Sequence, residues 1–204
     1  MKIYFLAFAL TGLAACSAHT EANRDSFTAA VSDYLDKRGD LCLGKYDWPI
    51  EVSAQEIQLG GRNAVQLPVL EKLGIVRSTD VSTDDHAQPA AAPLAARRYE
   101  LTETGKKFYL KRAGAAGGEH PADFCAAKLS LDKIVSWEVH ENGAHSEAVV
   151  TYTYRVDAAP WAKDADAQRV FPAVARVLNG AGKAQLREAF TLTGQGWAAK
   201  DSLD

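Results

Sequence analysis

The chain has 204 residues, of which 47% are hydrophobic and 24% are charged, and its net charge is −3 at neutral pH. These values exclude a disordered chain, a collagen and a multi-span membrane protein, and they fit one or two small folded domains. Three cysteines are too few for a disulfide-dense miniprotein. The charge also lacks the excess of Lys and Arg that is typical of a dedicated nucleic-acid-binding protein.

The first sixteen residues predict export and lipid attachment. One lysine precedes an uncharged apolar run over residues 3–13, which is too short to span a bilayer and has the length of a signal peptide. The run ends in Leu13-Ala14-Ala15-Cys16, which resembles the lipobox of bacterial lipoproteins. That resemblance implies removal of residues 1–15 and acylation of Cys16, for example with palmitate. The alternatives are a plain secretory signal that is cut near Ala15 and a buried first helix.

Ser17 indicates the compartment of the mature protein, and the compartment in turn bears on the state of the two remaining cysteines. Ser17, in place of an aspartate, resembles lipoproteins that are sorted to the outer membrane, so we expect a periplasm-facing protein anchored there. In that oxidising compartment Cys42 and Cys125 form an even pair, for which we predict a disulfide. Closing this loop would restrict the unfolded chain by roughly 4.5 kcal/mol in the chain-entropy model. Two separate buried thiols are the alternative.

After a lipidated tether over residues 16–22, the first helix is marked by an apolar stripe, with Asn23 or Asp25 as its cap and Gly39 as its end. Residues 45–52 predict a strand that Pro49 confines to a sheet edge. A second helix is predicted over residues 63–73, where Pro68 is tolerated only near the first turn. Residues 81–96 predict a flexible loop. The apolar stripe consists of Phe27, Ala30, Val31, Tyr34 and Leu35.

Residues 62–110 resemble the end of a winged-helix domain. A helix ends at Leu73-Gly74, strands flank the 81–96 loop, and a Tyr-x-Leu-Thr-x-x-Gly element over residues 99–105 starts another helix. The resemblance implies a winged-helix-like α/β unit over residues 23–112, in which Gly74 ends one helix and Thr102 caps the next. Acidic residues dilute its basic ones, so we expect protein contact or a purely structural role and no nucleic-acid partner.

Beyond a linker over residues 113–121, we predict an antiparallel sheet-plus-helix unit over residues 122–204, and an α+β class for the whole chain. A helix is predicted over residues 166–178, delayed or bent by Pro172, with further strands around residues 186–192 and Trp197. Asn142-Gly143 predicts a two-residue turn between two strands of about four in the sheet. The turn would place Leu131 opposite Tyr154, Val135 opposite Val150, Trp137 opposite Ala148 and His140 opposite His145.

The same pairing places Glu138 opposite Glu147. His140, His145, Glu138 and Glu147 are therefore the candidate ligands of a zinc or copper ion, and an ordinary solvated sheet face is the alternative. Signatures of hydrolases and phosphate-binding loops are absent, so we predict neither an enzyme nor a cofactor. Four tryptophans could line a sugar or peptide groove or belong to the core: Trp48, Trp137, Trp161 and Trp197.

These observations predict a lipid-anchored cell-envelope protein with a binding or structural role, whose partner is an envelope protein or a glycan. The first alternative is an inhibitor or immunity-type protein of an envelope hydrolase, with residues 81–96 as the inserting element. The second is a metal-binding protein centred on the 138–147 hairpin.

Overall fold

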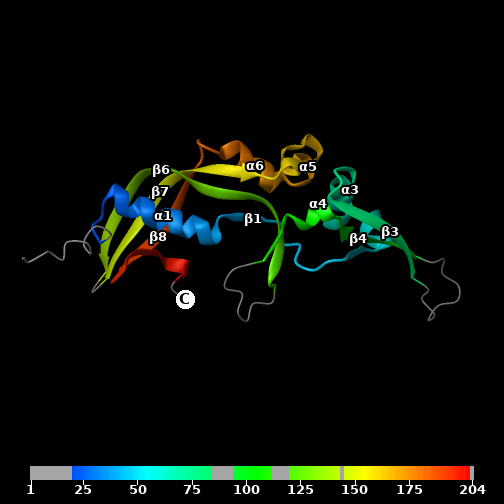
Figure 1. Ribbon diagram of the computed structural model, residues 1–204, viewed down its shortest axis with the longest axis horizontal. Coiled ribbons are helices and arrows are strands. Elements are labelled where there is room, and N and C mark those ends of the chain that lie inside the picture. The colour runs from blue at the N-terminus through cyan, green and yellow to red at the C-terminus, as the bar shows by residue number, and fades with distance from the viewer. Residues whose placement is uncertain (1–19, 84–93, 112–119, 143–144, 203–204) are drawn as a thin grey trace, which may run out of the picture.

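The computed structural model describes residues 20–83, 94–111, 120–142 and 145–202. The export signal, Cys16 and most of the tether lie outside these ranges. Within them, α-helices combine with two antiparallel sheets, which confirms the predicted α+β class (Figure 1). No helix in these ranges is long and apolar enough to cross a membrane.

The first helix, α1 (Arg24–Arg38), forms as its sequence predicts. The Asn23 side chain accepts a hydrogen bond from the Ser26 backbone N–H at 2.9 Å and caps the helix. The apolar stripe faces the larger sheet, with Phe27 and Val31 fully buried. Gly39 ends the helix where a β-carbon would lie 2.6 Å from the Leu129 carbonyl oxygen, so no larger residue fits there without a shift of the backbone.

The larger sheet contains the four strands predicted for residues 122–204, and two strands from the N-terminal part of the chain join them. Its order is β1-β6-β7-β8-β9, and β5 pairs with the start of β6. β6 begins nine residues before the alternating pattern at Leu131, and all of its residues from 122 to 127 are buried. The strands are β1 (Asp40–Cys42), β5 (Tyr109–Lys111), β6 (Ala122–Asn142), β7 (His145–Ala158), β8 (Gln185–Thr193) and β9 (Gly196–Ala199).

The register of β6 and β7 corrects the predicted pairing. Leu131 lies opposite Tyr154 as predicted, but Trp137 lies opposite Val150 and His140 opposite Glu147. Two irregularities in β6, one after Leu131 and one after Ile134, each insert a residue that changes face. Inward positions are thus Leu131, Ile134 and Trp137, whereas Val135 is 37% exposed, contrary to the predicted alternation.

The smaller sheet has the order β2-β4-β3. β2 (Ile50–Val52) is shorter than the predicted strand because it begins only after Pro49, but it does lie at an edge. β3 (Val76–Thr83) and β4 (Leu94–Leu101) pair along their whole lengths, so both ends of the predicted loop are strand, and residues 84–93 lie outside the described ranges.

Three helices accompany this sheet: α2 (Ala54–Gln58), α3 (Arg62–Lys72) and α4 (Glu103–Lys106). Gly74, with φ +72°, follows the end of α3, and the Thr102 hydroxyl caps α4 by accepting the Gly105 N–H at 3.0 Å; both predictions are confirmed. Pro68 lies inside α3 and not in its first turn. It is exposed, so the carbonyl that loses its helical partner lies toward the solvent side of the helix.

The helix predicted over residues 166–178 is divided in two. After the 3-10 turn η1 (Pro160–Lys163), α5 (Ala165–Val170) ends at Phe171, and α6 (Pro172–Gly180) starts with Pro172 at its first position. Proline is common at the first position of a helix, because the backbone N–H that it lacks would have no partner within the helix. A second 3-10 turn, η2 (Lys200–Ser202), closes the described chain.

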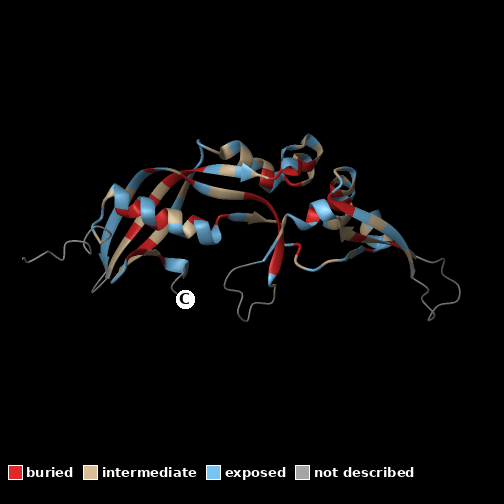
Figure 2. Ribbon diagram, in the orientation of Figure 1, coloured by how far each residue is buried: buried red, intermediate tan, exposed pale blue. Residues whose placement is uncertain are grey.

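Two hydrophobic clusters organise these elements (Figure 2). The α1 cluster packs α1 against β6, β7, β8 and β9 around Phe27 and Phe190. The junction cluster joins α3, the smaller sheet and the start of β6 to η1, α5 and α6 around Leu70, Phe124 and Trp161. Each cluster takes residues from both sides of the 113–121 segment, so packing crosses the predicted boundary between the units 23–112 and 122–204.

Candidate functional site

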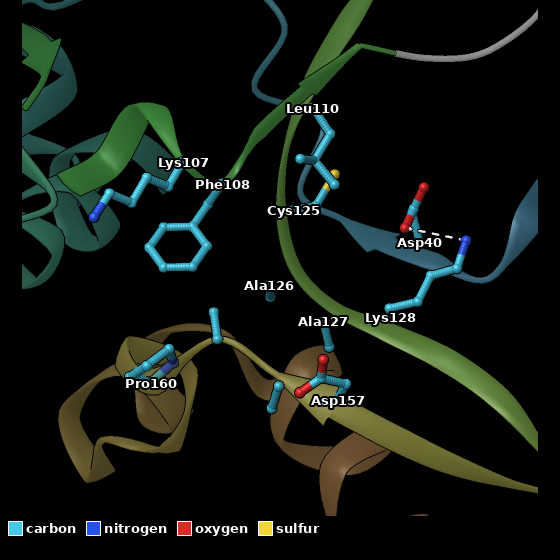
Figure 3. A pocket seen from close by; sticks show the side chains of 12 residues that line it. Asp40, Lys107, Phe108, Leu110, Cys125, Ala126, Ala127, Lys128, Asp157 and Pro160 are labelled. Carbon is cyan, nitrogen blue, oxygen red and sulfur yellow. Dashed lines mark ion pairs between the residues drawn. The ribbon is translucent and has the colours of Figure 1, made fainter. Parts of the chain in front are cut away.

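Two hollows adjoin where the larger sheet meets the elements of the junction cluster. One, of about 260 Å³, is bordered by β1, β5, β6 and β7, and the other, of about 500 Å³, by the start of β3, α4 and η1. Both are lined by Phe108 and Pro160, and we refer to these two neighbouring hollows together as the junction groove. Figure 3 shows the first hollow, with Phe108 and Pro160 on one side and the Asp40–Lys128 ion pair on the other.

Small side chains create the first hollow. Ala126 and Ala127 in β6 lie beside Ala158 and Ala159, which end β7 and follow it. The Ala159 N–H donates to the Ala126 carbonyl at 2.9 Å, so the backbones at this point are fixed close together. Methyl groups cannot fill the space that bulky strand residues would occupy, and the sheet surface is therefore recessed here.

Aromatic side chains form the base beside the second hollow. Trp161 is 5% exposed and stacks on Phe124 with ring centroids 5.3 Å apart. Phe108 and Phe171 meet Trp161 edge-on, at 6.5 and 5.7 Å. Leu73 and Ile75 add aliphatic surface. Such a lining favours burial of apolar groups of a ligand.

The rim of the groove carries charges of both signs. Asp40 and Lys128 form an ion pair at 3.4 Å, and Asp164 caps α5 through the N–H groups of Asp166 and Ala167. Lys107, Asp157 and Lys163 form no ion pair with another described residue. With cations and carboxylates interspersed, the rim offers no single-sign field for a polyanion or a polycation.

A disulfide fixes one wall of the groove. Cys42 in β1 and Cys125 in β6 are paired across the strands with a Cα–Cα distance of 3.8 Å, as the sequence predicted. Cys125 itself lines the first hollow. The bond joins residues 83 positions apart, so it restricts how far β1 can separate from β6 when the chain opens locally.

A buried polar network continues this restraint. Asp123 is 3% exposed, and its carboxylate accepts the backbone N–H groups of Lys45 at 2.9 Å, Phe124 at 2.7 Å and Gly44 at 3.2 Å. Lys45 is also buried, and its ammonium donates to the Asn63 side-chain oxygen at 2.6 Å. Burial, reinforced by the Arg62 charge, lowers the pKa of Lys45 to about 8, although Glu56 and Asp123 partly oppose this shift. The network therefore ties residues 44–45 to β6 and α3.

The hairpin register differs from the one on which the candidate metal site was predicted. β6 extends to Asn142 and β7 begins at His145, so residues 143 and 144 separate them, and His140 lies opposite Glu147 rather than His145. Glu138 lies opposite Val149 and within 4.0 Å of Arg187, and Glu147 pairs with Lys200 at 3.1 Å. Protein cations thus face both carboxylates. Among the described residues no group of three His, Cys, Asp or Glu side chains could hold a metal ion; the His145 side chain lies outside them.

Of the four tryptophans, Trp161 lines the groove. Trp137 and Trp197 contact Phe27, and Trp48 packs edge-on against Phe124. Neither the junction groove nor the Asp123 network is predicted by a pattern in the sequence. The available signal is the pair of Ala-Ala steps at 126–127 and 158–159, but such steps also occur at 95–96 and 198–199 and therefore do not by themselves indicate a recess.

Comparison with protein-family models, with curated proteins and with solved structures found no match to this chain.

Proposed function

We propose that this chain is a lipid-anchored protein of the bacterial outer membrane, facing the periplasm, which binds an extended segment of another envelope protein in the junction groove. The anchor is the acylated Cys16 that the lipobox resemblance implies. The observation that supports the binding role is the pair of adjoining apolar hollows that share Phe108 and Pro160. The proposed role is binding without catalysis.

The composition of the groove favours a protein segment as its ligand. Two neighbouring recesses suit side chains two residues apart in an extended peptide, because such side chains point to the same face of a strand. The mixed rim charges give a peptide donors and acceptors but would not select a nucleic acid or another polyanion. A glycan is the rival ligand, since the half-buried Phe108 offers aromatic surface, although Trp161 is only 5% exposed.

We further propose that residues 62–110 belong to a winged-helix-like unit that serves protein contact. The order α2, α3, β3, β4 and the sheet order β2-β4-β3 support it, as do the helix end at Gly74 and the cap at Thr102. Salt bridges between the strands, such as Arg77–Glu100 at 2.8 Å, leave its cations partly neutralised. A phosphate-binding surface would need them unpaired.

Inhibition of an envelope hydrolase is a second candidate function. β3 and β4 pair over eight residues, and Thr79, Asp80 and Arg97 in this hairpin are exposed. A long exposed hairpin of this kind is suited to insertion into the active site of a hydrolase. Deletion of residues 84–93 should abolish inhibition of the target hydrolase, and full inhibition by the deleted variant would exclude this role.

The anchor is tested by metabolic labelling with an alkynyl palmitate analogue. The wild-type chain should incorporate the label and sediment with outer membranes, and Cys16→Ser should lose the label. Cys42→Ala/Cys125→Ala should retain it, which controls for labelling at the other cysteines. An unlabelled wild-type chain that carries residues 1–15 would overturn the proposal.

The groove is tested by filling it. Leu110 borders the first hollow and is 40% exposed, so a benzophenone residue at this position should crosslink the bound segment in membranes. Ala158→Leu should reduce that crosslink at least tenfold, because the larger side chain occupies the recess. Ala29→Leu, the same change at an exposed position of α1, should leave it unchanged. Mass spectrometry should identify one continuous peptide; a crosslink that is equal in both variants, or to glycan alone, would refute the proposed ligand.

A further inference from the structure

The described chain starts immediately beyond the proposed lipid attachment residue. Thr20 lies four residues after Cys16, and a fully extended chain rises at most about 3.6 Å per residue. Thr20 is therefore held within about 14 Å of the lipid-bearing residue. Whatever surface surrounds Thr20 in the fold must lie near the headgroups of the bilayer that holds the acyl chains.

The segment after Thr20 is fixed to the larger sheet. The Glu21 carbonyl accepts the Trp197 indole N–H at 3.3 Å and the Asn23 N–H at 3.0 Å. The Arg24 guanidinium lies 5.8 Å from the ring centroid of Trp137 and donates to the Ile134 carbonyl. The start of α1 is thus connected to both β6 and β9 and cannot swing away from the sheet without breaking these contacts.

This region is one end of an elongated molecule. In Figure 1 the start of α1, the hairpin end of β6 and β7 and the turn between β8 and β9 lie together at one end of the long axis. The β3–β4 hairpin lies at the opposite end, and the disulfide region with the junction groove lies between them. We refer to the first of these as the anchor end.

Charge at the anchor end does not favour an anionic membrane. Carboxylates there outnumber cations, and several are already paired, such as Glu147 with Lys200 at 3.1 Å. A juxtamembrane basic cluster would be expected if electrostatics contributed to anchoring. The charged residues of this region are Glu21, Arg24, Asp25, Glu138, Glu141, Glu147, Arg187 and Lys200.

We infer that the anchor end rests on the lipid headgroup surface, held there by acyl chains without electrostatic help, and that the groove and the β3–β4 hairpin are displaced from the membrane along the long axis. This inference rests on the proposed acylation of Cys16. It gives the protein a polarity, since the short tether keeps the anchor end beside the bilayer whereas no attachment holds the opposite end there. A partner would meet the groove from the periplasm and not from within the membrane.

Site-directed spin labels on the acylated, full-length mature protein test this orientation. The introduced thiol is the only free one, because Cys16 carries lipid and Cys42 is bonded to Cys125. Glu141→Cys labels the anchor end and Thr79→Cys labels β3; both positions are exposed. In vesicles with a nickel-chelating headgroup lipid, the label at 141 should show at least fivefold greater relaxation enhancement than the label at 79. Equal enhancement, or a larger one at 79, would overturn the inference.

A second measurement separates this inference from the anchor itself. Flotation with vesicles should recover acylated protein at low and high salt, and Cys16→Ser should fail to float with either phosphatidylcholine or phosphatidylglycerol vesicles. Failure of the wild-type chain to float would refute the lipid anchor. Flotation of Cys16→Ser with phosphatidylglycerol vesicles, but not with phosphatidylcholine vesicles, would refute the claim that electrostatics do not contribute. If the wild-type chain floats but the spin label at 79 shows the larger relaxation enhancement, the orientation is refuted and the lipid anchor is not.

Discussion

The α1 cluster and the junction cluster are built in different ways. In the α1 cluster one long helix covers strands that are neighbours in the larger sheet, β6, β7, β8 and β9, and Phe27 is enclosed by Trp137 at 5.4 Å and Trp197 at 5.0 Å. The junction cluster gathers short elements from residues 43 to 178, and a disulfide and a buried carboxylate fasten them. The groove lies beside the second kind of packing.

This difference explains where a recess can persist. Long strands and a helix bury a continuous apolar face, which leaves little space between side chains. Short segments that meet at several angles leave hollows, which would collapse without restraints on the backbone. Cys42–Cys125 and Asp123 supply such restraints directly beside the first hollow. We therefore expect the groove to depend on the disulfide and on the Asp123 hydrogen bonds more than on the amount of buried apolar surface.

The largest expected effect concerns the α1 cluster. Phe27→Ala removes a fully buried ring and should lower the free energy of unfolding by about 3–5 kcal/mol. Urea denaturation measures the loss, and hydrogen exchange should show it first in α1 and β9. Leu70→Ala, the matched truncation in the junction cluster, should instead expose α3 and the start of β3. Identical exchange patterns in the two variants would show that the clusters do not differ in this way.

The disulfide should matter chiefly to the junction cluster. Cys42→Ala/Cys125→Ala should lower the free energy of unfolding by about 2–5 kcal/mol and reduce exchange protection in β1 and β5 more than in β7 and β8. Reductant should produce the same loss in the wild-type chain and none in the double variant. Uniform loss of protection over both clusters would contradict the local role assigned to this bond.

The smallest expected effect is the contribution of Lys45 to the pH dependence of the free energy of unfolding. Its pKa is about 8 in the folded chain and about 10.4 when unfolded, so the unfolded state holds more protons between these values. Stability should therefore rise with pH there, by about 1 kcal/mol from pH 7 to 9. Lys45→Met should lose this rise. The comparison is made below pH 10, because burial, with a contribution from Glu188, raises the pKa of Tyr34 to about 12, which makes stability fall at higher pH.

The α1 region was predictable from local pattern. The stripe on α1, its cap at Asn23, the end at Gly39 and the cap at Thr102 depend on contacts within a few residues, and all are observed. The disulfide was predicted for another reason, because the proposed acylation of Cys16 leaves Cys42 and Cys125 as a single pair. By contrast, the predicted β6–β7 register failed beyond Leu131, since alternation cannot reveal where a strand inserts an extra residue.

The sequence by itself thus determined the helices and strands with strong periodicity, the α+β class and the pairing of Cys42 with Cys125. Only the tertiary structure decided that α1 packs on strands more than a hundred residues away, that Ala126 and Ala158 meet to leave a recess, and that Asp123 is held by the backbone of residues 44–45. The physical reason is range. Caps and periodicity are properties of neighbouring residues, whereas a groove is the space that remains after distant segments have packed.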